Sequence, residues 1–263
     1  MRRTKADRAD TIIYGIHAVE HFLRRFPERV LQIMVTGERQ DRRLSSITDG
    51  AKRMGLVPQT VSRETLDRHS GNGAHQGVLA VIRPRPPGNE DDLEVLLDRL
   101  SDPPFLLVLD GLQDPHNLGA CLRTADATGV HAVVAPRNRA VGLSSAVRKV
   151  ASGASESVPF IQVTNLARSL RRLAERGLKR VGAEGEAATS LFDADLTGGL
   201  AVVLGAEGSG LRRLTREHCD LLVSLPMRGV VESLNVSVAT GVFLYTALAQ
   251  RPVSRLASGE GFD

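Results

Sequence analysis

The sequence predicts an α/β protein with two domains, the larger of which is built around a parallel sheet. In residues 93–250, short apolar runs of strand length alternate with segments of helical spacing, and this alternation is typical of parallel sheets. A proline-rich segment at 84–92 separates this part from a smaller α/β domain at 11–83. The chain of 263 residues is long enough for such a pair of domains.

The smaller domain follows a basic tail at residues 1–10. Its helices are indicated by apolar residues at helical spacing, and its strands by short aliphatic runs. The expected elements, in order, are a helix over 14–23, a strand over 30–35, a charged helix near 41–54, a strand near 57–61, a short helix from about residue 63 and a strand over 78–82.

The larger domain continues this alternation, and residues 251–263 are expected to form a flexible tail. The expected strands are 105–109, 131–135, 158–162, 179–182, 200–204 and 221–225. The expected helices are 117–128, 144–154, 165–176, 211–218 and 234–250. Ligands of parallel sheets bind beyond the carboxyl ends of the strands, where the chain turns into a helix. We therefore expect the functional residues at these turns.

The composition favours a cytoplasmic protein with a polyanionic partner. The 34 Lys and Arg residues against 30 Asp and Glu give a net charge of +4, which is mildly cationic. Aromatic residues make up 3% of the chain and tryptophan is absent, which argues against an aromatic platform for stacking bases. No apolar run approaches about 18 residues, and the N-terminus is basic and polar, so neither a membrane span nor a signal peptide is expected.

The two cysteines, Cys121 and Cys219, lack the Cys and His spacing of zinc sites. Both lie in helical patterns and are expected to be small buried residues. The sequence therefore predicts neither a metal site nor a disulfide.

The first polar constellation follows the expected strand 105–109 and enters a helix. Residues 114–125 read D-P-H-N-L-G-A-C-L-R-T-A. Asn117 and Arg123 lie six positions apart, so they can share a broad face if the helix starts near Asn117. In the alternative interpretation, Asp114 or Asn117 caps the helix and Arg123 is a solvated surface residue.

The second constellation, G-A-E-G-S-G-L at 205–211, follows the expected strand 200–204. Its three glycines allow close approach of the backbone to a ligand. The order of the glycines differs from the dinucleotide fingerprint, and no Lys-Ser/Thr pair follows Gly210 as in a Walker loop. Glu207 is suited to sugar hydroxyls or a cation, or it complements the dipole of the following helix.

The third constellation lies at 226–241, where a polar Ser-Leu-Asn triplet at 233–235 opens what should be a buried helix of small residues. Ser233 and Asn235 either cap this helix or line a site for an oxygen-rich ligand. Together, the three constellations supply backbone amides, one carboxylate, one guanidinium and neutral polar groups. They lack a nucleophile with its base, a metal cluster and a carboxylate pair, so a metal-free group transfer fits best.

At these three stretches the chain closely resembles the SpoU (TrmH) group of the SPOUT RNA methyltransferases. The family patterns D-P-x-N-x-G-A-x-x-R-T-A, G-x-E-G-x-G-L and P-M-x-G-x-x-x-S-L-N-V-S-x-A occur in order and at matching spacing. The similarity extends to residues 148–156. Residues 14–19 and 75–78 resemble family members that carry a ribosomal-protein-like RNA-binding domain, including those that methylate guanosine in large-subunit ribosomal RNA.

The resemblance implies a C-terminal domain with a trefoil knot that binds S-adenosylmethionine without a metal, and a homodimer formed through the knotted region. It implies that the backbone around four residues holds the cofactor, namely Gly205, Leu225, Met227 and Leu234. It implies that five side chains surround the target ribose, namely Asn117, Arg123, Glu207, Ser233 and Asn235. The chain departs from the family at Arg228, Val231 and Glu232, where small neutral residues are more usual. These departures affect the expected identity of the substrate more than the expected type of reaction.

The residues of the three constellations agree with attack of a ribose 2′-oxygen on the methyl group of a sulfonium ion. This reaction requires that the oxygen and the methyl group are aligned and that alkoxide character on the oxygen is stabilised. The resemblance assigns proton removal to Arg123, but arginine is essentially always protonated in proteins. We therefore expect Arg123 to hold a phosphate or to stabilise the developing oxyanion, and the role of base stays open. The alternatives are a transfer-RNA ribose methyltransferase and a non-catalytic RNA-binding ribosome-assembly factor. A dinucleotide-dependent oxidoreductase is disfavoured by the glycine order.

Overall fold

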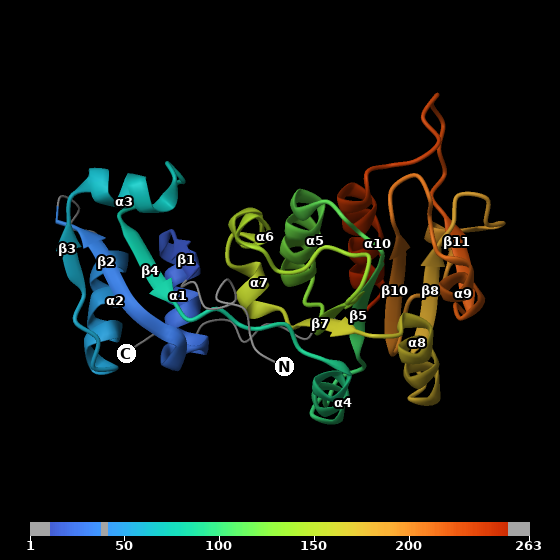
Figure 1. Cartoon of the computed structure of the whole chain (residues 1–263), viewed down its shortest axis with the longest axis horizontal. Helices are drawn as coiled ribbons and strands as arrows, with labels where there is room; N and C mark the ends of the chain where they lie inside the picture. The colour runs from blue at the N-terminus through green and yellow to red at the C-terminus, as the bar shows by residue number, and fades with distance from the viewer. Residues whose placement is uncertain (1–10, 38–41, 252–263) are drawn as a thin grey trace. The chain divides into compact units, whose positions relative to one another are not determined.

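The computed structural model describes residues 11–37 and 42–251, and the chain divides into two compact units at Pro86/Pro87 (Figure 1). The expected basic tail at 1–10 and residues 252–263 of the expected C-terminal tail lie outside the described residues. The two units are described separately below.

The N-terminal unit contains a four-stranded mixed sheet with the strand order β1-β4-β2-β3. Its strands are β1 (Thr11–Tyr14), β2 (Val30–Thr36), β3 (Gln59–Val61) and β4 (Val78–Ile82). Its helices are α1 (Ile16–Arg25), the short 3-10 helix η2 (Pro27–Arg29), α2 (Arg42–Arg53) and α3 (Arg63–Ser70). Alternate strand residues point to opposite faces. Ile33 therefore packs in the core under α1 and α2, whereas Met34 packs with Leu66 of α3.

Strand β1 was not expected from the sequence, and the helix expected over 14–23 begins later, at Ile16. Tyr14 ends β1, which pairs antiparallel with β4, and Gly15 separates it from α1 with a φ of 92°. The helical spacing around Tyr14 is a local signal, and pairing with a distant strand overrides it.

The segment between the units is shorter than the expected linker 84–92. Asn89 caps α4 (Glu90–Asp98), and its side chain accepts hydrogen bonds from the backbone N–H groups of Asp91 and Asp92. The Asn89 backbone N–H in turn donates a hydrogen bond to the Asp92 carboxylate, which completes a capping box. Residues 90–92 are therefore the first turn of a helix.

The C-terminal unit contains a seven-stranded sheet in which every recorded pairing is parallel, with the order β7-β6-β5-β10-β8-β11-β9. Its strands are β5 (Phe105–Asp110), β6 (Ala132–Pro136), β7 (Phe160–Val163), β8 (Lys179–Ala183), β9 (Thr189–Ser190), β10 (Leu200–Gly205) and β11 (Leu221–Ser224). The expected parallel α/β sheet is confirmed. The two-residue strand β9 was not expected.

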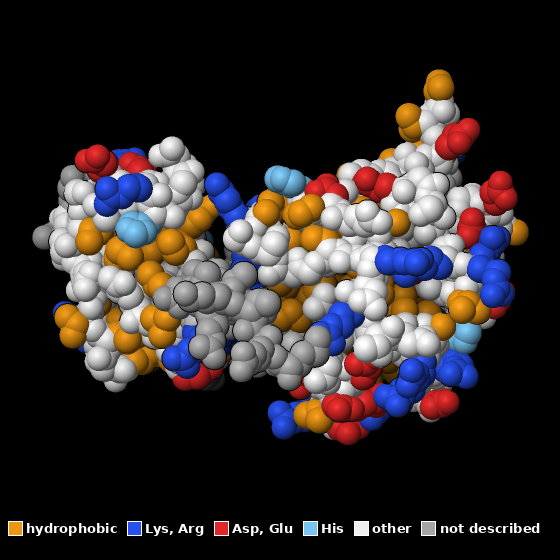
Figure 2. Space-filling model, in the orientation of Figure 1, with side chains coloured by type: hydrophobic (Ala, Val, Ile, Leu, Met, Phe, Trp, Pro, Cys, Tyr) orange, Lys and Arg blue, Asp and Glu red, His pale blue; other side chains and the backbone are white. Residues whose placement is uncertain are grey.

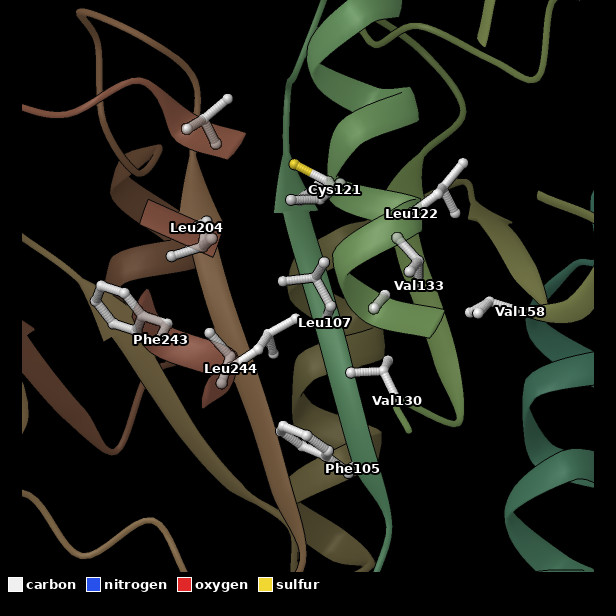
Figure 3. Packing of buried hydrophobic residues seen from close by; sticks show 14 of the residues in the cluster. Phe105, Leu107, Cys121, Leu122, Val130, Val133, Val158, Leu204, Phe243 and Leu244 are labelled. Carbon is white, nitrogen blue, oxygen red and sulfur yellow. The ribbon is translucent and has the colours of Figure 1, made fainter. Parts of the chain in front are cut away.

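Helices cover both faces of this sheet. They are α5 (Pro115–Ala127), α6 (Ser145–Ala151), α7 (Ala154–Ser157), α8 (Leu166–Glu175), α9 (Arg213–Glu217) and α10 (Val236–Gln250), with the short 3-10 helix η3 (Leu191–Asp193). Phe105 and Leu107 of β5 face a core that contains side chains of α5 and α10, including Leu122 and Phe243 (Figure 3). Leu106 points to the opposite face, where α4 and α8 pack. The result is a three-layer arrangement.

Two local features differ from expectation. The helix expected over 144–154 is split into α6 and α7, because Ser152 and Gly153 adopt positive φ angles of 51° and 95°. Arg251, expected to begin a flexible tail, is anchored. Its guanidinium donates to the carbonyls of Gly198 and Pro103 and lies 4.5 Å from the ring centroid of Phe105.

Candidate active site

The three polar constellations meet beyond the carboxyl ends of strands of the parallel sheet. Asn117 is the third residue of α5, which follows β5, and Glu207 lies in the loop after β10. Asn235 immediately precedes α10, which follows β11. In Figure 1 the segments that follow these strands lie at the same end of the sheet. Because β5 and β10 are parallel neighbours, with Asp110 in register with Gly205, their following loops are brought together.

The carboxylate of Glu207 joins the two asparagines. Its Oε1 accepts hydrogen bonds from Asn235 Nδ2 at 2.6 Å and from Asn117 Nδ2 at 2.9 Å. Asn235 Nδ2 also donates to Asn117 Oδ1 at 3.1 Å, and the Val236 backbone N–H lies 3.4 Å from Glu207 Oε1. Asn117, Glu207 and Asn235, here called the amide–carboxylate trio, thus form a closed hydrogen-bonded set. Bonds to an ionised acceptor are among the stronger protein hydrogen bonds.

Helix capping fixes the orientation of the Asn235 side chain. Its Oδ1 caps α10, because it accepts hydrogen bonds from the Ser237 backbone N–H at 2.9 Å and from Ser237 Oγ at 2.5 Å. Its amide nitrogen therefore points to Glu207. The capping interpretation of Asn235 is confirmed, and the same residue also belongs to the trio. At α5 the cap is Asp114, whose carboxylate accepts from the His116 N–H.

The structure does not bring Arg123 or Ser233 to the trio. Asn117 is buried, at 8% exposure, whereas Arg123 is exposed. Six residues of helix separate their directions by about 120°. In the described part of the chain, the side chain of Arg123 makes no hydrogen bond or ion pair, and the same holds for the side chain of Ser233, which is exposed just before α10.

Three of the expected cofactor-binding residues, Leu225, Met227 and Leu234, lie in or next to the loop between β11 and α10. Within the described ranges, residues 226–234 form no backbone hydrogen bond. Figure 1 shows the segment between β11 and α10 extending away from the sheet. Leu225 packs against the core, Met227 is half-buried and Leu234 is exposed. Free backbone donors and acceptors suit the polar edges of a nucleoside, and the apolar side chains beside them suit the faces of its base, so these residues fit S-adenosylmethionine.

Gly205 allows the Glu207 loop to close tightly. A Cβ on Gly205 would lie 2.1 Å from the carbonyl carbon of Gly210, and Ala206 and Gly210 are joined by two backbone hydrogen bonds of 3.2 and 2.9 Å. We expect Gly205→Ala to force the loop open and to lower the free energy of unfolding by about 1–3 kcal/mol. Chemical denaturation measures this. Gly185→Ala is the control, because nothing lies within 4 Å of its added Cβ. Equal stability of the two variants would contradict this account of the loop.

Both cysteines are free thiols. Cys121 is buried and lies 3.2 Å from Thr240 Oγ1, and burial, with a further contribution from the Glu207 charge, raises its pKa to about 11. Cys219 is half-buried, and desolvation raises its pKa to about 12. Both thiols are therefore protonated at neutral pH. The expected burial is confirmed for Cys121, whereas Cys219 is only partly covered.

The described residues offer neither a metal-binding cluster nor a membrane-spanning helix. No group of three or more His, Cys, Asp or Glu side chains is arranged to hold a metal ion. None of the helices in these ranges is both long and apolar enough to cross a membrane.

Sequence reasoning missed an ion pair at the end of the loop that carries Glu207. Asp110, at the end of β5, accepts a hydrogen bond from the backbone N–H of Arg212, and its carboxylate also pairs with the Arg212 guanidinium. The only signal in the sequence is an acidic residue directly after an apolar strand. Such a residue is as readily interpreted as part of a turn.

Family models match most of the chain. The SpoU rRNA Methylase family matches residues 104–245, which contain all three constellations. A second model, RNA 2′-O ribose methyltransferase substrate binding, matches residues 12–88.

Several characterised proteins are similar over nearly their whole length. The 23S rRNA (guanosine-2′-O-)-methyltransferase RlmB of Yersinia pestis is 54% identical over 240 residues, which cover 91% of this chain and 97% of that protein. RlmB of Pectobacterium atrosepticum is 53% identical, with coverage of 91% and 98%.

Solved structures show the same fold. A crystal structure of an RNA 2′-O ribose methyltransferase is 26% identical, with a TM-score of 0.69 over 92% of this chain and 89% of that one. The SpoU methyltransferase AviRb from Streptomyces viridochromogenes, in complex with AdoMet, is 21% identical, with a TM-score of 0.69 and coverage of 92% and 90%. The expected fold class, a SpoU-type α/β domain with an added N-terminal domain, is confirmed.

Proposed function

This chain belongs to the SpoU rRNA methylase family, and we propose that it methylates the ribose 2′-oxygen of a guanosine in 23S ribosomal RNA with S-adenosylmethionine as the methyl donor. Similarity to RlmB proteins over 91% of the chain supports the reaction and the class of substrate. The substrate-binding model over residues 12–88 supports RNA contact by the N-terminal unit.

The amide–carboxylate trio is the observation that carries the proposal. The three residues come from three separate motifs. Asn117 and Glu207 are 90 positions apart along the chain, and Glu207 and Asn235 are 28 positions apart. Their hydrogen bonds preorganise one carboxylate and two amides. Transfer of a methyl group to a weak nucleophile, such as a ribose hydroxyl, requires polar groups that are preorganised in this way. We assign the trio to positioning the ribose that carries the reacting hydroxyl.

Leu225, Met227, Leu234 and the free backbone of residues 226–234 would hold the cofactor, with Gly205 shaping the adjoining wall. When bound, S-adenosylmethionine supplies an electrophilic methyl group. Glu207 Oε1 is engaged by the two asparagines, so its other oxygen is the one to accept a hydrogen bond from a ribose hydroxyl. Ser233, an exposed residue of the 226–234 segment, supplies a further hydroxyl for the sugar.

Arg123 would supply positive charge to the bound RNA from a position on α5 that lies outside the trio. Its guanidinium is exposed and has no partner among the described side chains, so RNA can reach it. We assign it to holding the phosphate of the target nucleotide or to stabilising the 2′-oxyanion as the proton leaves.

The surface supports RNA contact through separate basic residues. On the face in Figure 2, Lys and Arg side chains occur on both units, interspersed with acidic side chains on the C-terminal unit. Such a surface favours local arginine contacts to phosphates, and these position the RNA without reading its sequence. Because the substrate is ribosomal RNA, we also propose that the protein acts in the cytoplasm.

Incubation with labelled S-adenosylmethionine tests the proposal. We expect label in unmodified 23S RNA, at a single mapped 2′-O-methylguanosine, and none in transfer RNA. Label in transfer RNA alone would favour the alternative substrate. Label in neither RNA would overturn the enzymatic function.

We also propose that the protein is a homodimer that pairs through α10. This helix is apolar around its circumference, yet Val238 and Tyr245 are 52% and 53% exposed. With Gly241 they form a stripe at i, i+3 and i+7, which is a spacing found on helix-packing faces.

A double substitution tests this interface. We expect Val238→Glu with Tyr245→Glu to convert the dimer to a monomer, because like charges would face each other across the symmetric contact. Sedimentation velocity measures the change, with Arg171→Glu on the exposed face of α8 as the control. A wild-type monomer would contradict the proposal.

A further inference from the structure

A buried carboxylate with an incomplete set of partners lies at the end of β5. The Asp110 side chain is 0% exposed, and its Oδ2 accepts the Arg212 backbone N–H at 2.9 Å. Its Oδ1 lies 3.4 Å from Arg212 Nη1 and, among the described residues, has no hydrogen-bond partner. A buried carboxylate is costly unless it is paired and hydrogen-bonded. Asp110 therefore depends on Arg212 for both interactions.

Arg212 is fixed by more than this carboxylate. Its Nη2 donates to the carbonyl of Arg139 at 3.3 Å. The guanidinium also lies directly against Gly111, where an added Cβ would be 2.7 Å from Nη2. Gly111 has a φ of 85°. Asp110, Gly111, Arg139 and Arg212 together form a clasp, here called the Asp110 clasp.

The clasp holds one end of the loop that carries Glu207. Residues 207–210 are exposed, and Gly208 and Gly210 have positive φ angles of 75° and 62°. The bonds between Ala206 and Gly210 close the loop on itself without attaching it to the sheet. The loop is therefore attached to the sheet at Gly205, the last residue of β10, and at its other end, where the Leu211 side chain is buried in the core and Arg212 bonds to Asp110. Glu207 lies between these two anchors.

We infer that Asp110 is a positioning residue for methyl transfer, because through Arg212 it fixes the loop that presents Glu207 to Asn117 and Asn235. This inference rests on the proposed function of the trio. Without the Asp110 charge, Arg212 loses its ion pair and the loop gains freedom at its second anchor. A displacement of Glu207 of even about 1 Å would lower the rate substantially.

Asp110→Asn tests the inference, because the asparagine oxygen can still accept the Arg212 N–H while the charge is lost. We expect kcat to fall by about tenfold to a hundredfold, with KM for RNA changed by less than about twofold. In the free protein, hydrogen exchange of the Gly210 and Arg212 amides should become faster, while exchange in β5 and β10 stays unchanged. Arg213→Gln is the matched control, because among the described residues Arg213 pairs only with the exposed Glu217.

Wild-type kcat or wild-type exchange in Asp110→Asn would overturn the inference. Equal acceleration of exchange across β5 and β10 would also overturn it, because Asp110 would then only stabilise the fold. If this variant does not fold, the pair Asp110→Asn with Arg212→Gln is measured in the same way, because it removes both charges of the ion pair. The exchange measurement needs no substrate, so it tests the clasp even if the wild-type protein fails to methylate RNA.

Discussion

Replacing Glu207 with alanine is expected to lower kcat for RNA methylation by about a hundredfold or more. The substitution removes the oxygen that accepts from Asn117 Nδ2 and Asn235 Nδ2, so both amides lose their common partner. Asn117 is buried, and leaving its amide unpaired should cost about 1–3 kcal/mol of stability as well. Initial rates with saturating RNA and S-adenosylmethionine measure the first effect, and denaturant unfolding measures the second.

Glu207→Gln separates the charge from the hydrogen bonds, because the glutamine oxygen can still accept from one or both asparagines. We expect its kcat to lie between those of wild type and Glu207→Ala. Glu184→Gln is the matched control, because Glu184 forms an ion pair with Arg216, 3.4 Å apart, outside the trio. A wild-type rate in Glu207→Ala would remove the trio from the mechanism.

Replacing Arg123 with alanine is expected to lower kcat/KM by about a hundredfold to a thousandfold without changing the fold. Arg123 is exposed, and among the described residues it has no partner. Loss of its side chain should therefore change the free energy of unfolding by less than about 0.5 kcal/mol. Arg171→Ala, which removes another exposed arginine, is the control and should retain activity. Full activity of Arg123→Ala would exclude both roles proposed for this residue.

The pH dependence of Arg123→Lys distinguishes those roles from general-base catalysis. If Arg123 acts by charge, lysine should reduce the rate by a similar factor across the pH range. If Arg123 removes the proton, the basic limb of the pH–rate profile should shift, because lysine has a lower intrinsic pKa than arginine. We expect the uniform reduction.

Local sequence patterns predicted most strands of the larger unit within two or three residues. The apolar runs that became β5 and β10 are nearly continuous, as expected for strands covered on both faces. The patterns could not predict that β10 lies between β5 and β8, because pairing order depends on contacts between distant segments. The trefoil knot implied by the family resemblance likewise has no periodic signal. The short β1 was missed for the same reason, since its pairing with β4 is non-local.

The site was predictable in part. The motifs identified Asn117, Glu207 and Asn235, and the rule that ligands bind beyond the strand ends placed them at one edge. Their hydrogen bonds required the three-dimensional arrangement. Asp110 and Arg212 were missed because an ion pair between residues 102 positions apart leaves no local pattern.

The central position of β10 constrains how this protein acquires its structure during synthesis. The strand enters the sheet between β5 and β8, although both precede it in the chain. Until residue 205 has left the ribosome, β5 presents one unpaired edge and β8 presents two, because its other neighbour, β11, also follows it in the chain. Unpaired edges favour aggregation. Long-range parallel pairing is also slow to form. Nascent chains of this enzyme should therefore depend on chaperones until the middle strand is in place.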